Sequence, residues 1–182
     1  MFALATAAVL SACGARGGKS TTGDANNTGF YVRGGQLTYQ VEISRALNPY
    51  SIEDHQYLSG VPAGTPPPGG DAEWFAVFMW AKNFTKKAHT TVPASDFDIV
   101  DTQGNTYYPV TLNPSINPLA WTQMTLQPQG TEPAVDSLAS NDPAQGSELL
   151  FKLNDSIYAN RPLTLYIHVP GQPRPSSFLL DL

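Results

Sequence analysis

Hydrophobic residues recur at every second position in several segments of this chain. The clearest segments are 37–43, 149–153 and 163–169, where an apolar side chain returns at each alternate residue. A period of two places the apolar groups of a segment on one face of an extended strand. The pattern therefore predicts β-strands with one face turned toward a core.

One segment is apolar on both faces. Residues 73–83 carry a dense run of tryptophan, phenylalanine, valine and methionine without alternation, which is typical of a central strand covered on each side. Further strands are predicted at 119–126 and 178–182. Residues 97–110 are predicted to form a hairpin around the turn residues 101–105.

Proline and glycine separate these segments, and the chain holds 16 prolines and 15 glycines. Residues 48–71 contain several prolines and are expected to form a long loop, of the kind that is usually functional or disordered. Only residues 156–160 suggest a helical turn. Seven to eight short strands predict an all-β domain over residues 36–182, an immunoglobulin-like antiparallel β-sandwich, with a small barrel as the alternative.

The amino-terminal segment has a different composition. Residues 1–12 are uncharged and mostly apolar, as in an export signal that is removed, and they are too short to span a membrane. Residues 10–14 read Leu-Ser-Ala-Cys-Gly and resemble the lipobox of bacterial lipoproteins, which implies lipidation of Cys13. Basic residues normally open such a signal, so we expect the natural start to lie upstream of Met1. Residues 13–35 are expected to form the lipidated cysteine and a flexible tether.

Charge and cysteine content limit the partners and covalent links that we expect. The net charge is -5 and only 14% of residues are charged, which argues against a nucleic-acid partner because phosphate binding needs clustered basic residues. Cys13 is the single cysteine of the sequence, so no disulfide can form within the chain. The sequence gives no reason to expect a cofactor.

Four segments together resemble a known family. They are Trp74–Asn83, residues 97–107 with their Asp-Thr-Gln-Gly turn, the Pro-Gln-Gly turn at 128–130, and Leu149–Leu153. Their order is similar to that of the telokin-like domain of unknown function found on many bacterial lipoproteins. The resemblance covers about residues 36–182 and implies an immunoglobulin-like sandwich at the cell surface. It implies no catalytic residues, because the family has no established set.

The densest group of carboxylates is Asp96, Asp98 and Asp101, and calcium prefers several such oxygen ligands at close range. In an extended strand, however, Asp96 and Asp98 share one face and Asp101 points away, so a solvated face with turn capping is the interpretation that we favour. The three histidines lie far apart in the sequence, and no Gly-x-Ser-x-Gly motif occurs. We therefore predict neither a metal site nor catalytic residues.

Aromatic residues offer a different kind of site. Trp80, Tyr107, Tyr108, Tyr57 and Trp121 could form a platform for a sugar or peptide, because flat amphipathic rings are favoured at binding surfaces. Tyr57 and Trp121 are the expected exposed members, since both lie near proline-rich turns. The alternative is that these rings fill the core.

These observations lead to two alternative hypotheses for the function. The first is a lipoprotein held by its lipid on the extracytoplasmic face of the cell membrane, acting as a non-catalytic interaction or ligand-binding module. Its partner would be an envelope protein or glycan, bound by loops such as 48–71 or 113–118. The alternative is an envelope hydrolase or metal-dependent enzyme that uses Asp96, Asp98, Asp101 and a histidine.

Overall fold

Two long strands form the centre of the molecule. The computed structural model describes residues 20–24 and 30–180, and in it β3 (Leu37–Leu47) pairs antiparallel with β4 (Ala72–Lys82). On its other edge β4 pairs antiparallel with β11 (Ser147–Asn154). The prediction of a central strand at residues 73–83 is confirmed, because β4 has a long partner on each edge.

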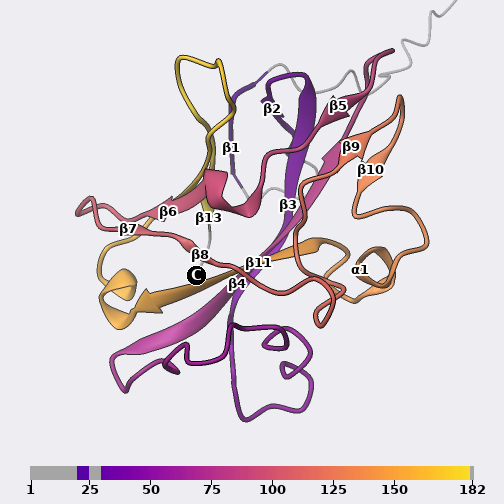
Figure 1. Ribbon diagram of the computed structural model, residues 1–182. Helices are drawn as coiled ribbons and strands as arrows, with labels where there is room; N and C mark the ends of the chain where they lie inside the picture. The colour runs from indigo at the N-terminus through magenta and orange to yellow at the C-terminus, as the bar shows by residue number, and fades with distance from the viewer. Residues whose placement is uncertain (1–19, 25–29, 181–182) are drawn as a thin grey trace, which may run out of the picture.

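The remaining strands complete two large sheets and a small one (Figure 1). Three short strands extend the larger sheet: β2 (Val32–Gly34) beside β3, β8 (Pro109–Val110) beside β11, and β10 (Thr131–Glu132) beside β4. The second sheet has the order β1 (Thr22–Asp24), β13 (Ser176–Leu180), β12 (Leu163–Ile167), β6 (Phe97–Val100) and β7 (Thr106–Tyr107). The small sheet joins β5 (His89–Thr90) to β9 (Thr125–Leu126).

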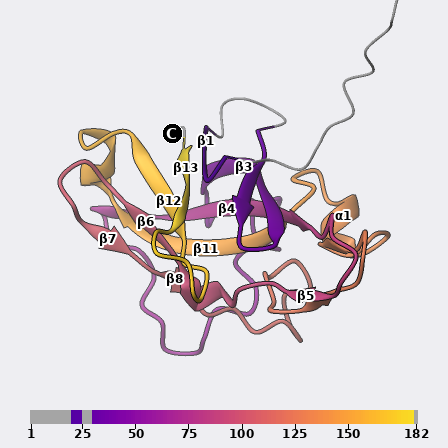
Figure 2. The same cartoon turned by 90° about the horizontal axis from the view of Figure 1, so that it is seen from above.

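Helical structure in the described part of the chain is limited to α1 (Leu138–Asn141) and two 3₁₀ turns, Ala94–Asp96 and Asp155–Tyr158. Figure 2 shows α1 on the side of the molecule away from the β6–β7 hairpin. The predicted all-β, immunoglobulin-like sandwich is confirmed. The predicted strand number is too low, since the described residues form 13 strands. Strands of two or three residues are too short for a periodic pattern to reveal.

A β-bulge in β3 changes the face on which its apolar residues lie. The pairing with β4 shifts between Val41 and Ile43, which leaves Glu42 as the extra residue. Val41 lies opposite Met79 in the core between the sheets, whereas Ile43 lies opposite Phe78 and is 41% exposed. The prediction that Ile43 shares the buried face of Val41 is therefore wrong, because alternation does not reveal an inserted residue.

β4 buries its two faces in two separate clusters. Phe75, Val77 and Met79 belong to the main core, which also contains residues of the second sheet. Trp74 and Phe78 belong to a smaller cluster on the outer face of the larger sheet. Both faces of the strand are thus covered, as its unbroken apolar run predicts.

The long loop 48–71 covers this outer cluster. Tyr57 and Leu58 of the loop pack into the cluster, and Arg45 of β3 forms an ion pair with Asp54 of the loop. Figure 1 shows the loop in violet at the bottom of the molecule, between the end of β3 and the start of β4. The loop is therefore a packed part of the fold.

The folded domain begins earlier than residue 36. β1 and β2 both lie within the segment 13–35 that was expected to be a tether, and β1 pairs parallel with β13. This corrects the expected boundary: backbone pairing orders even a polar segment that has few apolar side chains. Residues 1–12 and Cys13 lie outside the described residues. Among the described residues, no helix has the length and apolar character needed to cross a membrane.

Candidate functional site

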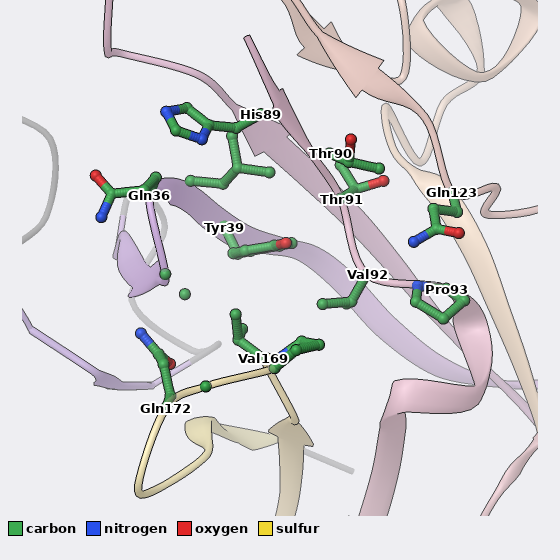
Figure 3. Close-up of a pocket in the computed structure, with 15 residues that line it drawn as sticks. Gln36, Tyr39, His89, Thr90, Thr91, Val92, Pro93, Gln123, Val169 and Gln172 are labelled. Carbon is green, nitrogen blue, oxygen red and sulfur yellow. The ribbon is translucent and has the colours of Figure 1, made fainter. Parts of the chain in front are cut away.

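A pocket of about 530 Å³ opens at one end of the sandwich. Most of its lining comes from three segments: the turn 34–37 between β2 and β3, residues 89–93 that begin with β5, and the loop 169–172 that follows β12. Gln123 adds a fourth point of the lining. Figure 3 shows side chains of these segments around a common space, with Tyr39 of β3 between them. Since the segments are distant in sequence, the pocket exists only in the folded domain.

Glycines shape two rims of this pocket. A Cβ atom on Gly34 would lie 2.7 Å from the ring of Tyr39, so only glycine lets the turn approach the ring this closely. Gly35 and Gly171 have φ values of +63° and +80°, which L side chains rarely adopt. Both turns are therefore fixed in shape by their glycines.

The lining mixes polar and apolar residues and carries almost no formal charge. It includes the amides of Gln36, Gln123 and Gln172 and the hydroxyl of Thr90, whereas no lysine, arginine, aspartate or glutamate is among the described lining residues. His89 is the one histidine in the described lining. Such a surface offers both donors and acceptors without selecting an ion.

The inner wall of the pocket is held by the core. Trp121 Nε1 donates a hydrogen bond to the Val92 carbonyl oxygen at 2.9 Å, and the Thr91 amide donates to the Met124 carbonyl oxygen at 2.9 Å. Burial raises the pKa of Tyr39 to about 12, although a hydrogen bond with the Val92 backbone opposes this rise. Tyr39 is therefore a neutral phenol at the base of a rigid wall.

One polar atom of the lining lacks a partner. Gln172 Oε1 is buried and accepts no hydrogen bond from the described residues. The backbone amide of Gln172 donates to the Val169 carbonyl oxygen at 3.1 Å. This hydrogen bond holds the backbone from which the side chain projects. A buried amide oxygen without a donor is energetically unfavourable.

The predicted aromatic platform is not formed. Tyr57 is 4% exposed and Trp121 is 5% exposed, and they pack in different clusters. Tyr107 is also buried, Trp80 is half-buried and only Tyr108 is largely exposed. The expectation that Tyr57 and Trp121 bind a ligand at the surface is therefore wrong, because proximity to proline-rich turns does not reveal whether a ring faces inward. The alternative, that the rings fill the core, describes both residues.

The three predicted carboxylates take separate positions. Asp101 is buried in its turn, where Oδ1 accepts hydrogen bonds from the Gln103 and Asn105 amides, both at 2.9 Å. Asp98 Oδ2 lies 2.8 Å from His168 Nε2, and Asp96 ends a 3₁₀ turn before β6. No group of three or more metal-ligating side chains occurs among the described residues.

Sequence reasoning missed the pocket residues Gln36, Tyr39 and Gln172. Gln36 is predicted to begin the folded domain and Tyr39 to lie on the buried face of a strand, and no element is predicted at Gln172. The loops proposed for binding are 48–71 and 113–118. The glycines of the two rims are a local signal for tight turns. No local signal indicates that these turns meet at one end of the sandwich.

Comparisons with known proteins support the fold. No protein-family model matches the chain, and no curated protein matches its sequence. The crystal structure of the yjhA protein from Bacillus subtilis is similar, with a TM-score of 0.51 and 10% identity over 84% of this chain and 97% of that chain. An uncharacterized β-sandwich protein from Clostridium difficile 630 gives a TM-score of 0.45 and 10% identity over 91% of this chain and 99% of that chain. At this identity the likeness concerns the fold alone.

Proposed function

We propose that this protein is a non-catalytic binding module whose pocket, lined by Gln36, Tyr39 and Gln172, accepts a neutral ligand rich in hydroxyl or amide groups. The observation that carries the proposal is the lining itself, which combines amide and hydroxyl side chains with almost no formal charge. A ligand with many neutral donors and acceptors matches such a surface, whereas an ion would find no partner of opposite charge.

The position of the pocket also supports binding. Its rims are turns, and its wall is part of the core, an arrangement in which a rigid scaffold presents recognition groups. The described lining of this pocket contains His89 but no carboxylate, so it provides no paired acid and base. An envelope glycan or the backbone of an envelope protein has the neutral hydrogen-bonding chemistry that the pocket would recognise.

We further propose that the module is a lipoprotein of the telokin-like family, held on the extracytoplasmic face by a lipid on Cys13. The support is the Leu-Ser-Ala-Cys-Gly sequence at residues 10–14, the apolar run before it and the family-like segments between residues 74 and 153. A mature lipoprotein carries two or more acyl chains, which hold a protein firmly to a membrane.

The binding proposal is tested with a trisaccharide of N-acetylglucosamine, a neutral probe with hydroxyl and amide groups. We expect the trisaccharide to shift the NMR signals of the backbone amides of Gln36, Thr90 and Gln172. Val169→Trp should weaken binding by about tenfold or more by filling the pocket, while Val135→Trp, on an exposed residue that does not line this pocket, should leave it unchanged.

A second variant tests the unpartnered amide. Gln172→Leu keeps the approximate size of the side chain but removes the amide, so it should weaken binding without changing the fold. Shifts that survive Val169→Trp, or that lie outside the pocket, would contradict the proposal. The absence of any shift with the trisaccharide would count against a glycan-type ligand.

A further inference from the structure

A second pocket lies on the opposite side of residues 122–124, a segment that also borders the first pocket. Gln123 lines the first pocket, whereas its neighbours Thr122 and Met124 line a hollow of about 330 Å³. Neighbouring residues of an extended chain face opposite sides, so one segment serves as the wall of both pockets. The second pocket also contains Glu132 and Ser147.

Glu132 occupies a position where a carboxylate is unexpected. It lies opposite Ala81 in the pairing of β10 with β4, and Ala81 belongs to the core between the sheets. Paired residues of neighbouring strands face the same side of a sheet, so Glu132 projects from the core face and is 5% exposed. Ser147 lies opposite Met79 on the same face, which places its hydroxyl beside the carboxylate.

Only one oxygen of this carboxylate has a protein partner. Ser147 Oγ donates to Glu132 Oε1 at 2.7 Å, and no hydrogen bond or ion pair reaches Oε2 in the part of the chain that the structure describes. Burial raises the pKa of Glu132, while the Ser147 hydrogen bond opposes the rise. Buried carboxylates are normally paired with a cation, so Glu132 lacks the partner that its position calls for.

The rest of the lining is largely apolar. Pro118, Ala120, Met124 and Ala134 contribute carbon surface around the carboxylate. Alkyl stems of cationic side chains pack on such surfaces while the charged end finds a polar partner. A single free carboxylate oxygen suits an ammonium, which is a compact donor, better than a guanidinium, which prefers two parallel hydrogen bonds.

We propose that this pocket, lined by Glu132, Ser147 and Met124, binds a primary alkylammonium group, with the ammonium on Glu132 and the alkyl chain along the apolar wall. The group comes from a lysine side chain of a polypeptide or from a free amine, and both sources present the same chemistry. The inference does not depend on the first pocket, because the two sites share a wall but no lining residue.

The test uses the methionine methyl groups as reporters. Protein labelled with ¹³C at the methionine methyl groups is titrated with n-butylammonium and, separately, with n-butanol, its neutral counterpart. Met124 lines the pocket and should shift more than Met79, which is fully buried in the core behind Ser147. We expect butylammonium to bind at least about tenfold more tightly than butanol.

Glu132→Gln is the decisive variant, since it keeps the size of the side chain and removes the charge. It should abolish the preference for butylammonium over butanol, whereas Glu53→Gln on the exposed loop should keep it. A circular dichroism spectrum that matches that of the unmodified chain shows that the variant is folded. The comparison of the two probes on the unmodified chain tests the proposal even if the variant does not fold.

The source of the ammonium is distinguished by a third probe, lysine blocked as an N-acetyl methylamide. Binding at least as tight as that of butylammonium would indicate a polypeptide partner, and exclusion of the blocked lysine would indicate a small amine. Equal binding of butanol and butylammonium would overturn the proposal, as would unchanged binding in Glu132→Gln. A negative result with the trisaccharide in the first pocket would leave these outcomes unaffected.

Discussion

Glu148 is a buried carboxyl group on the outer face of β11, where 1% of the residue is exposed. Its Oε2 accepts a hydrogen bond from Asn117 Nδ2 at 3.0 Å, and Oε1 has no partner among the described residues. Its pKa is raised to about 8, mainly by burial and to a lesser extent by Asp142, while the Asn117 hydrogen bond and Arg45 oppose the rise. The carboxyl group is therefore largely protonated in the folded protein at neutral pH.

We expect the free energy of unfolding to fall as pH rises through this range. The ordinary pKa of the group is 4.5 and the folded value is about 8, so between them the folded state binds one more proton than the unfolded state. The contribution is fully present below pH 4.5 and is lost as pH rises through the folded pKa, at about 1.4 kcal/mol per pH unit. Urea unfolding at several pH values between about 5 and 8 measures this slope.

The assignment to Glu148 is checked by substitution. Glu148→Gln cannot titrate and should remove most of the pH dependence, while Glu53→Gln on the exposed loop should leave it in place. A slope that persists in Glu148→Gln would show that other groups cause it.

The polar residues differ in how far the sequence predicts their roles. Asp101 accepts hydrogen bonds from Gln103 and Asn105, which follow it in the same turn, and such local capping can be predicted from the order of residues. Asn117 instead reaches the carbonyl oxygen of Ser59, at 3.2 Å, and the Glu148 side chain. These partners are distant in sequence, so only the folded chain reveals them.

For the strands too, the sequence predicts local features but not the pairing of segments that are distant in the chain. The alternation at residues 163–169 predicts β12 and its buried face, and the turn at 101–105 predicts the hairpin of β6 and β7. Val110 lies three residues after the end of β7, yet it pairs with Leu150 of the other sheet. A change of sheet, like the bulge in β3, leaves the periodic pattern almost unchanged. The pattern therefore does not predict that residues 34–37, 89–93 and 169–172 meet at the first pocket.

β1 is a short strand that depends on one small residue. Gly23 lies opposite Phe178 of β13, and an added Cβ atom would lie 2.6 Å from Val32 and 3.0 Å from Phe178. Backbone hydrogen bonds on either side hold the segment, since the Ser177 amide donates to the Thr21 carbonyl oxygen at 2.8 Å. The strand therefore stays in place through close approach and backbone pairing.

Gly23→Val is expected to release β1 while the two sheets remain folded. The added side chain overpacks a contact that is already close, which destabilises by about 1–3 kcal/mol. Hydrogen exchange should show faster exchange of the Ser177 and Arg33 amides, which donate to carbonyl oxygens of residues 20–21, and unchanged exchange within β4. Gly70→Ala is the matched control, because its added Cβ atom would meet nothing within 4 Å. Retained protection at Ser177 in Gly23→Val would contradict this role of the glycine.

The two ends of the sandwich have different characters. The turn before β3 lies at the first pocket, and β3 then runs 11 residues to the long loop 48–71, a length of roughly 35 Å. Thr22 pairs with Ser177, close to the loop 169–172 of the same pocket. The chain therefore enters β1 at the pocket end, opposite the long loop (Figure 1).

The proposed lipid on Cys13 gives a direct prediction for location. In a bacterium that processes lipoproteins, the native chain should partition into the membrane fraction, and its amino-terminal peptide should begin at an acylated Cys13. Cys13→Ser should move the protein to the soluble fraction, while Ser11→Ala, which keeps a small residue before the cysteine, should not. An unmodified amino terminus that precedes residue 13 would contradict the proposal.

Anchoring at Cys13 would also orient the domain. Residues 14–22 span at most about 30 Å when extended, so the end of the sandwich that holds Thr22 would lie nearer the membrane than the loop 48–71. With Cys13 blocked by lipid, Pro170→Cys and Ile52→Cys each supply one thiol for a fluorophore, and both positions are exposed. Energy transfer to acceptors on the lipid headgroups should be more efficient from position 170 than from position 52. Equal transfer would mean that the domain tumbles freely about its anchor, and stronger transfer from position 52 would mean that the long loop faces the membrane.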